Sequence, residues 1–230
     1  MEYYSEKTAQ FLNGMGLNLF ELIAVLSKES SPLLNLSQKQ QAEFDLYYDK
    51  LIEQDYSVHT KGALLEKLSR ILFCNSFFEI RCNCTTSTNE IDILITWSED
   101  ARVTTINKSF PCFGDYFLCE CKNYASKVGV TYIGKFASLL ESVRSSLGIM
   151  ISWEGITGTN WQDGVGLVKK LALCDCCNII VIDKDDLARI HRREVNIFKL
   201  ITDKFIALQN DIDFRQYIQK HEAEGVIKVE

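Results

Sequence analysis

The hydrophobic pattern changes its period between residues 60 and 182, and this change restricts the fold more than any other feature of the chain. Residues 60–75 place Leu64, Leu68 and Ile71 on one stripe, which is the spacing of an amphipathic helix, and Thr60 is a candidate cap. Residues 77–85 and 91–97 are short runs rich in β-branched and aromatic residues. They predict two strands of a hairpin, and a third strand is predicted over 116–122.

Helices and strands alternate after the third strand. Residues 130–147 return to helical spacing, and we expect Gly148 to end that helix. Strands are predicted at 149–153 and 178–182, with a helix over 161–173 capped near Asn160 and Asp163. Because a helix joins the third and fourth strands, these should be parallel with a right-handed crossover. The pattern therefore predicts an α/β fold in which helices flank a mixed sheet.

Helical sequence lies on both sides of this region. Residues 1–58 contain two helical stretches separated at 30–32, and the second runs over 37–54 with Ser37 as its cap. A chain of 230 residues accommodates one domain with additions. We therefore expect an N-terminal helical segment (1–58), a central domain (59–195) and a C-terminal helical extension (196–230).

The charge is distributed unevenly along the chain. The net charge is −6, but residues 61–199 hold 16 acidic and 17 basic residues, so overall acidity does not exclude a nucleic-acid partner. No apolar run approaches the roughly 18 residues of a membrane span, and the N-terminus lacks the basic and apolar regions of a signal peptide. We expect a cytoplasmic protein without membrane contact, whose nine cysteines are reduced.

An acid and a lysine stand two residues apart on the third predicted strand. Because side chains alternate across a strand, Glu120 and Lys122 should share one face, opposite to Cys121. On the second strand Asp92 lies between isoleucines, where a carboxylate is costly to bury alone. Two strand carboxylates and a main-chain carbonyl form an all-oxygen site of the kind that Mg²⁺ prefers.

These residues and their surroundings resemble the PD-(D/E)xK nuclease superfamily and, within it, the Mrr-like restriction endonucleases. The resemblance covers about 60–190, and two features depart from it: Thr88-Asn89-Glu90 stands where the family often has glycines, and the insertion from Ser98 to Asp115 is long. The matching segments are Lys61-Gly-Ala-Leu-Leu-Glu66, Glu90-Ile-Asp-Ile-Leu94, Phe117-Leu-Cys-Glu-Cys-Lys-Asn-Tyr124, Gly148-Ile-Met-Ile-Ser152 and 178–187.

The resemblance implies a restriction-endonuclease-like αβββαβ core and a Mg²⁺-dependent endodeoxyribonuclease, with Mn²⁺ as a substitute. Asp92, Glu120 and the main-chain carbonyl of Cys121 would hold the metal, which would polarise the scissile phosphate. Lys122 would orient the attacking water or stabilise the phosphate in the transition state, and Glu66 would contact a water of the metal. DNA would be the substrate, a homodimer or higher oligomer is expected, and the biological role would lie in restriction or phage defence.

Two other functions remain open from the sequence. The chain is either such an enzyme, or a catalytically inactive nuclease-fold module that binds nucleic acid or a protein, or a nuclease of the same fold that acts on RNA or DNA junctions. A nuclease for RNA or DNA junctions would share the metal site. The residues also have purely structural interpretations: Glu120 and Lys122 as an ordinary strand-end ion pair, Asp92 as a turn-proximal acid and Glu66 as a solvated helix residue.

Two further motifs favour other ligands only weakly. Cys174-Asp-Cys-Cys177 and Cys82-Asn-Cys84 are thiol pairs, but they lie far apart in sequence, so reduced thiols are favoured over a structural zinc. The segment from Gly129 to Phe136 resembles a P-loop, but Phe136 replaces the Ser or Thr that binds Mg²⁺. No nucleotide cofactor is therefore expected.

Overall fold

The computed structural model describes residue 14 and residues 34–53, 56–85, 90–103, 105–175 and 177–219. The chain divides into two units, Met1–Leu36 and Ser37–Glu230. The helical sequence expected before residue 34 lies outside the described residues, apart from residue 14. The segment predicted over 1–58 is divided between the two units, because the helix that starts at Gln38 belongs to the second.

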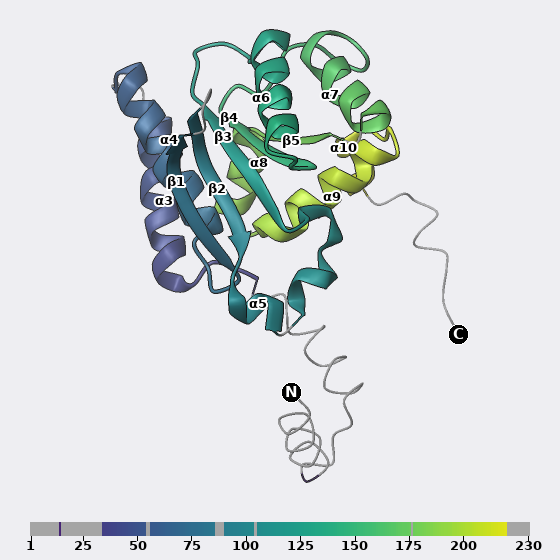
Figure 1. Cartoon of the computed structure of the whole chain (residues 1–230). Coiled ribbons are helices and arrows are strands. Elements are labelled where there is room, and N and C mark those ends of the chain that lie inside the picture. Colours follow the sequence, from purple (N-terminus) through teal and green to yellow (C-terminus); the bar gives the residue numbers. More distant parts are fainter. Residues whose placement is uncertain are drawn as a thin grey trace, which may run out of the picture. The chain divides into compact units, whose positions relative to one another are not determined.

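The second unit consists of a five-stranded sheet with helices around it (Figure 1). The strands are β1 (Phe78–Thr85), β2 (Glu90–Trp97), β3 (Tyr116–Lys122), β4 (Leu147–Ser152) and β5 (Asn178–Ile182). The α-helices are α3 (Gln38–Ile52), α4 (Val58–Phe73), α5 (Glu99–Val103), α6 (Val130–Ser142), α7 (Asp163–Cys174), α8 (Lys184–His191), α9 (Ile197–Gln209) and α10 (Phe214–Ile218), and two short 3-10 helices span Ile106–Ser109 and Pro111–Phe113.

The sheet is mixed and its strands follow the order β1-β2-β3-β4-β5. β1, β2 and β3 are antiparallel neighbours, whereas β3, β4 and β5 run parallel. The parallel pairing of β3 with β4 across a helical connection was predicted and is confirmed. The predicted α/β class, with helices on a mixed sheet, is confirmed as well.

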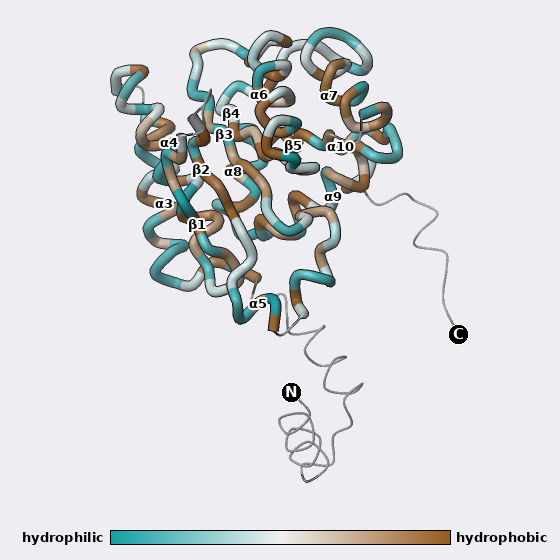
Figure 2. The backbone as a smooth tube through the Cα atoms, viewed as in Figure 1, coloured by the Kyte–Doolittle hydropathy of each residue, from teal (hydrophilic) through white to brown (hydrophobic). Residues whose placement is uncertain are grey.

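Helices cover both faces of the sheet (Figure 1). On one face α4 contacts β3, where Ser69 meets Cys121. On the other face Phe136 of α6 packs into a buried cluster with Leu118 and Met150 of the strands. The central strands are coloured largely as hydrophobic residues, as expected for strands that are covered on both faces (Figure 2). Since both faces are covered, β4 is buried along its whole length.

An aromatic cluster fills the core where β1 and the loop before β3 meet α9. Phe78 stacks on Phe198 of α9 with ring centroids 5.1 Å apart. The sequence after residue 195, predicted as an extension, therefore begins with a helix that packs on this core. Other rings within contact of the cluster are Phe73, Trp97, Phe110, Phe113 and Phe117.

Two predicted helix boundaries are wrong, at the start of α4 and at the end of α6. Ser57, not Thr60, caps α4, since its side chain accepts the Thr60 N–H at 3.2 Å. The helix predicted to continue to 147 ends at Ser142, and Gly148 lies inside β4. A Cβ on Gly148 would lie 2.6 Å from a Leu140 methyl group, so this glycine allows α6 to approach the strand.

The start of α7 also differs from the prediction. Gln162 occupies the position before the helix and its side chain makes no capping hydrogen bond. Asn160 and Asp163 instead adopt positive φ values of 52° and 48° in the loop that leads into the helix. Among the described helices, none is long and apolar enough to cross a membrane.

Candidate functional site

Asp92 on β2 and Glu120 and Lys122 on β3 lie on one face of the sheet, towards the end of β3. Ile93 pairs with Cys119, so Asp92 lies opposite Glu120 one residue further along the antiparallel register. Lys122 follows Glu120 by two residues and therefore shares its face. The predicted alternation is confirmed, since Cys121 points to the other face and its Sγ–H donates to Ser69 Oγ at 3.2 Å.

The three side chains make close polar contacts. Lys122 Nζ lies 2.5 Å from Glu120 Oε1, and the two side chains are 23% and 16% exposed. Asp92 Oδ2 accepts a hydrogen bond of 2.8 Å from the backbone N–H of Cys121. This bond holds the Asp92 carboxylate against β3, so two carboxylates and one ammonium share a partly buried site.

The electrostatics of the site reflect an excess of negative charge. Burial raises the pKa of Glu120, and the neighbouring charge of Asp92 raises it further, while Lys122 only partly opposes them. Burial alone would lower the pKa of Lys122, but the hydrogen bond and charge of Glu120, with the charge of Asp92, outweigh it and raise that pKa. The raised pKa of Lys122 favours its ammonium form, whereas the raised pKa of Glu120 disfavours its carboxylate form, which an added cation would stabilise.

The donor set fits a hard divalent cation. In a strand, the N–H and C=O of a residue that is paired with a neighbour point to the same side. Since the Cys121 N–H points to Asp92, its carbonyl is directed to that side too. The described residues contain no group of three or more His, Cys, Asp or Glu side chains that could hold a metal. Two carboxylates, one carbonyl and retained waters suit Mg²⁺, which commonly binds proteins through one or two carboxylates.

Glu66 lies on α4 and is engaged elsewhere. Its Oε2 is 3.7 Å from Arg70 Nη2 on the same helix, and its side chain is 41% exposed. α4 covers the face of β3 that carries Cys121, opposite to the face of Glu120. The structure therefore brings together Asp92, Glu120 and Lys122. Glu66 does not join them, because it pairs with Arg70 on the helix that covers the opposite face.

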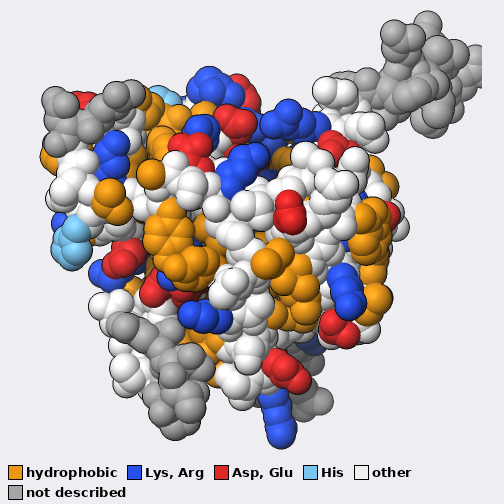
Figure 3. All heavy atoms as spheres, turned by 90° about the horizontal axis from the view of Figure 1, so that it is seen from above, with side chains coloured by type: hydrophobic (Ala, Val, Ile, Leu, Met, Phe, Trp, Pro, Cys, Tyr) orange, Lys and Arg blue, Asp and Glu red, His pale blue; other side chains and the backbone are white. Residues whose placement is uncertain are grey.

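A cavity of about 500 Å³ opens where β3 and β4 end. Asn123 and Tyr124, which directly follow Lys122, contribute to its wall. Seen from this end, the molecule shows hydrophobic side chains among separate basic and acidic ones (Figure 3). This cavity was not predicted from the sequence. Asn123 and Tyr124, a polar residue and an aromatic residue directly after the strand, were the feature that could have indicated it. Its lining includes Tyr56, Lys61, Asn123, Tyr124, Trp153 and Lys184.

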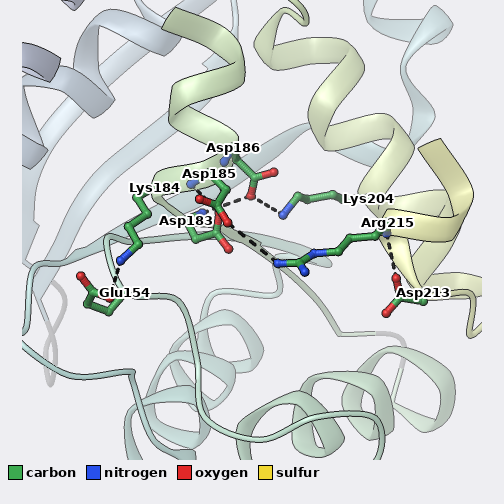
Figure 4. Close-up of polar contacts among 8 residues, drawn as sticks. All are labelled: Glu154, Asp183, Lys184, Asp185, Asp186, Lys204, Asp213 and Arg215. Atoms are coloured by element: carbon green, nitrogen blue, oxygen red, sulfur yellow. Dashed lines mark hydrogen bonds and ion pairs between the residues drawn. The ribbon is translucent and has the colours of Figure 1, made fainter. Parts of the chain in front are cut away.

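A second polar cluster surrounds the start of α8 (Figure 4). The Asp183 side chain caps the helix by accepting the N–H groups of Asp185 and Asp186. Asp186 in turn accepts from the Asp183 N–H and pairs with Lys204 of α9, which points towards it. These charged side chains are paired within the protein, so the cluster joins α8 to α9. Asp183 and Lys204 also line a cavity of about 330 Å³.

The cysteine motifs lie near opposite edges of the sheet. Cys82 and Cys84 are on β1, the first strand in the sheet order. Cys174 ends α7, and Cys177 directly precedes β5, the last strand. The eight cysteines that the structure describes are free thiols. The two pairs are therefore not brought together.

Comparisons with protein-family models and with curated proteins returned no match for this chain.

Proposed function

We propose that this chain is a Mg²⁺-dependent endonuclease with a restriction-endonuclease-like core that hydrolyses phosphodiester bonds in DNA. The observation that carries the proposal is the convergence of Asp92, Glu120 and Lys122 at the end of β3. Two partly buried carboxylates beside a retained ammonium favour binding of a cation and a phosphate together. A role in restriction or phage defence rests on the resemblance of the motifs alone.

The proposal assigns a role to each residue of the site. Asp92 and Glu120, with the Cys121 carbonyl, would hold Mg²⁺, which supplies Lewis-acid stabilisation of phosphate oxygens and a lower pKa for the attacking water. The Lys122 ammonium would stabilise the negative charge that develops on the phosphate and orient the attacking water. The Cys121 N–H would orient the Asp92 carboxylate. Glu66 has no role in this proposal because it pairs with Arg70.

A catalytically inactive binding module is the second candidate. The direct contact of Lys122 with Glu120 favours it, because an ordinary strand-end ion pair would have the same geometry. The two candidates differ in what happens when one charge is removed. An enzyme loses turnover more than binding, whereas a module has no turnover to lose.

The carboxylates can be tested with plasmid and linear duplex DNA in Mg²⁺, Mn²⁺, Ca²⁺ or EDTA. We expect cleavage in Mg²⁺ and Mn²⁺, and binding without cleavage in Ca²⁺, which tolerates looser geometry. Asp92→Asn and Glu120→Gln should abolish cleavage while the protein remains folded. Glu79→Gln is a matched control, since Glu79 is an exposed acid on β1. Equal cleavage in EDTA, or by the two site variants, would contradict the proposal.

Lys122 separates the two candidates. Lys122→Ala should bind DNA nearly as well as the parent but cut it at least about 100-fold more slowly, since one preorganised charge contact is worth about 10²–10³ in rate. Lys122→Arg should restore little activity because a planar guanidinium does not occupy the position of a compact ammonium. Gel-shift affinity and single-turnover rates on one duplex measure both effects. Unchanged cleavage by Lys122→Ala would leave Glu120 and Lys122 as a structural ion pair.

A further inference from the structure

The cavity at the end of β3 and β4 has the size and walls of a site for one planar ring system. Its volume of about 500 Å³ lies within the roughly 300–1,000 Å³ of small-ligand sites. Three aromatic side chains contribute to its lining: Tyr56, Tyr124 and Trp153. Tyr56 and Tyr124 are 37% and 36% exposed, so their rings are available to a ligand. Aromatic faces in an open cavity favour stacking with a flat, polar-edged ligand such as a nucleobase.

Two of the three aromatic rings that line the cavity contact a further ring. The Tyr124 ring centroid lies 5.2 Å from that of Tyr132 on α6, and Trp153 lies 6.0 Å from Tyr48 on α3. Tyr132 also carries the Lys135 ammonium 5.6 Å from its ring centre. Rings that are already fixed by neighbours lose little conformational entropy when a base stacks on them. The arrangement is therefore a preformed platform.

The platform adjoins the candidate catalytic residues. Tyr124 is two residues from Lys122, and the backbone N–H of Trp153 donates to the backbone carbonyl of Lys122 at 3.4 Å. Tyr124 and Lys122 also lie close enough for the lysine charge to act on the phenol. Lys122 itself is not among the described residues that line the cavity, so the ammonium groups within reach of a bound phosphate are those of the lining.

Basic side chains supply complementary charge for a nucleic-acid strand. Lys61 and Lys184 both line the cavity. Lys184 pairs with Glu154 at 2.8 Å, whereas no ion pair joins Lys61 to another of the described residues. A lysine beside stacked aromatic rings is the combination by which single strands are bound without base pairing.

We propose that this cavity binds one unpaired nucleotide of a DNA strand, with its base stacked on Tyr124 and its phosphate near Lys61. The inference rests on the proposed nuclease function and names its substrate as DNA with an unpaired nucleotide, either in a single strand or extruded from a duplex. A base that remains paired and stacked within a duplex cannot enter a concave site.

The test is fluorescence anisotropy with the full chain and fluorescein-labelled DNA in EDTA, where cleavage does not occur. Three probes of one length are compared: a single strand, a fully paired duplex and a duplex with one unpaired nucleotide. We expect the first and third to bind more tightly than the paired duplex. Tyr124→Leu should weaken single-strand binding about 5- to 150-fold, the range for loss of one base–aromatic stack, and Tyr124→Phe should retain it.

Matched variants make the result specific. Tyr217→Leu on α10 should bind as the parent does, and Tyr56→Leu provides a second change in the cavity if Tyr124→Leu does not fold. Parent-like binding by Tyr124→Leu, equal loss in Tyr124→Phe, or preference for the paired duplex would overturn the inference. Because this assay needs no turnover, it is separate from the cleavage tests: cleavage retained by Asp92→Asn would refute only the proposed function.

Discussion

Two lysine–carboxylate pairs in the same unit have opposite surroundings. The pair of Asp186 and Lys204 is nearly enclosed, with side chains 6% and 15% exposed. Lys204 also donates to the Val181 carbonyl at 2.7 Å and lies 4.8 Å from the centre of the Phe214 ring. The pair of Glu120 and Lys122 is more open and has a second carboxylate, Asp92, beside it.

The two pairs differ in how many donors and cations surround their acidic groups. Near α8, Asp183 has two backbone N–H donors of its own, so the acidic groups there are matched within the protein (Figure 4). Near β3, Asp92 has one backbone donor, and one lysine faces two acids. An ion pair with complete partners joins secondary-structure elements, whereas one with an unmatched acid at the end of a sheet is suited to bind a cation.

The largest expected effect is loss of the enclosed pair. Lys204→Met should lower the free energy of unfolding by about 3–5 kcal/mol, because it leaves Asp186 buried without its cation. Lys199→Met is the control on the same helix, since Lys199 is 66% exposed in its pair with Asp203. This variant should change the free energy of unfolding by less than about 0.5 kcal/mol. Urea denaturation measures both. Similar stability of the two variants would mean that the enclosed pair does not hold α9 in place.

At the open pair the acid is removed instead of the lysine, and stability should rise. Burial and Asp92 raise the pKa of Glu120 in the folded state, so its ionised form disfavours folding. In EDTA, Glu120→Gln should therefore raise Tm by a few degrees at neutral pH, where about 1 kcal/mol corresponds to roughly 2–4 °C in a chain of this size.

The pH dependence of this gain has a definite sign. The parent loses stability relative to Glu120→Gln as pH rises from the ordinary glutamate pKa through the raised value, and the difference is constant above it. Thermal melts across this range measure the difference, with Glu79→Gln as a flat control. A gain that grows towards acid pH would show that Lys122 outweighs burial and Asp92.

The smallest effect is expected at Glu66. Glu66→Gln removes an exposed pair with Arg70 one turn along α4, so stability should change by no more than about 0.5 kcal/mol. Cleavage rate in Mg²⁺ should stay within about twofold of the parent, because removal of a charge that contacts neither substrate nor catalytic group leaves transition-state binding unchanged. A rate loss comparable to that of Lys122→Ala would place Glu66 in the site after all.

Much of the fold could be predicted because periodicity records which side chains are buried. The change from helical spacing to short strands, and the helix between the third and fourth strands, predicted a mixed sheet with a parallel pair. Helix ends were predicted less well. A glycine often ends a helix, which is why Gly148 was predicted to do so. In the structure Gly148 lies in β4, where the absence of a side chain lets α6 pack closely on the strand. That packing depends on residues distant in the sequence.

The candidate site divides in the same way. The sequence alone determined that Glu120 and Lys122 share a face, since alternation along one strand is local geometry. Only the tertiary structure decided that Asp92 is held by the Cys121 N–H, that Glu66 pairs with Arg70, and that rings from three separate segments line one cavity. These relations depend on strand register and helix packing, which join residues far apart in the chain and leave no periodic trace in the sequence.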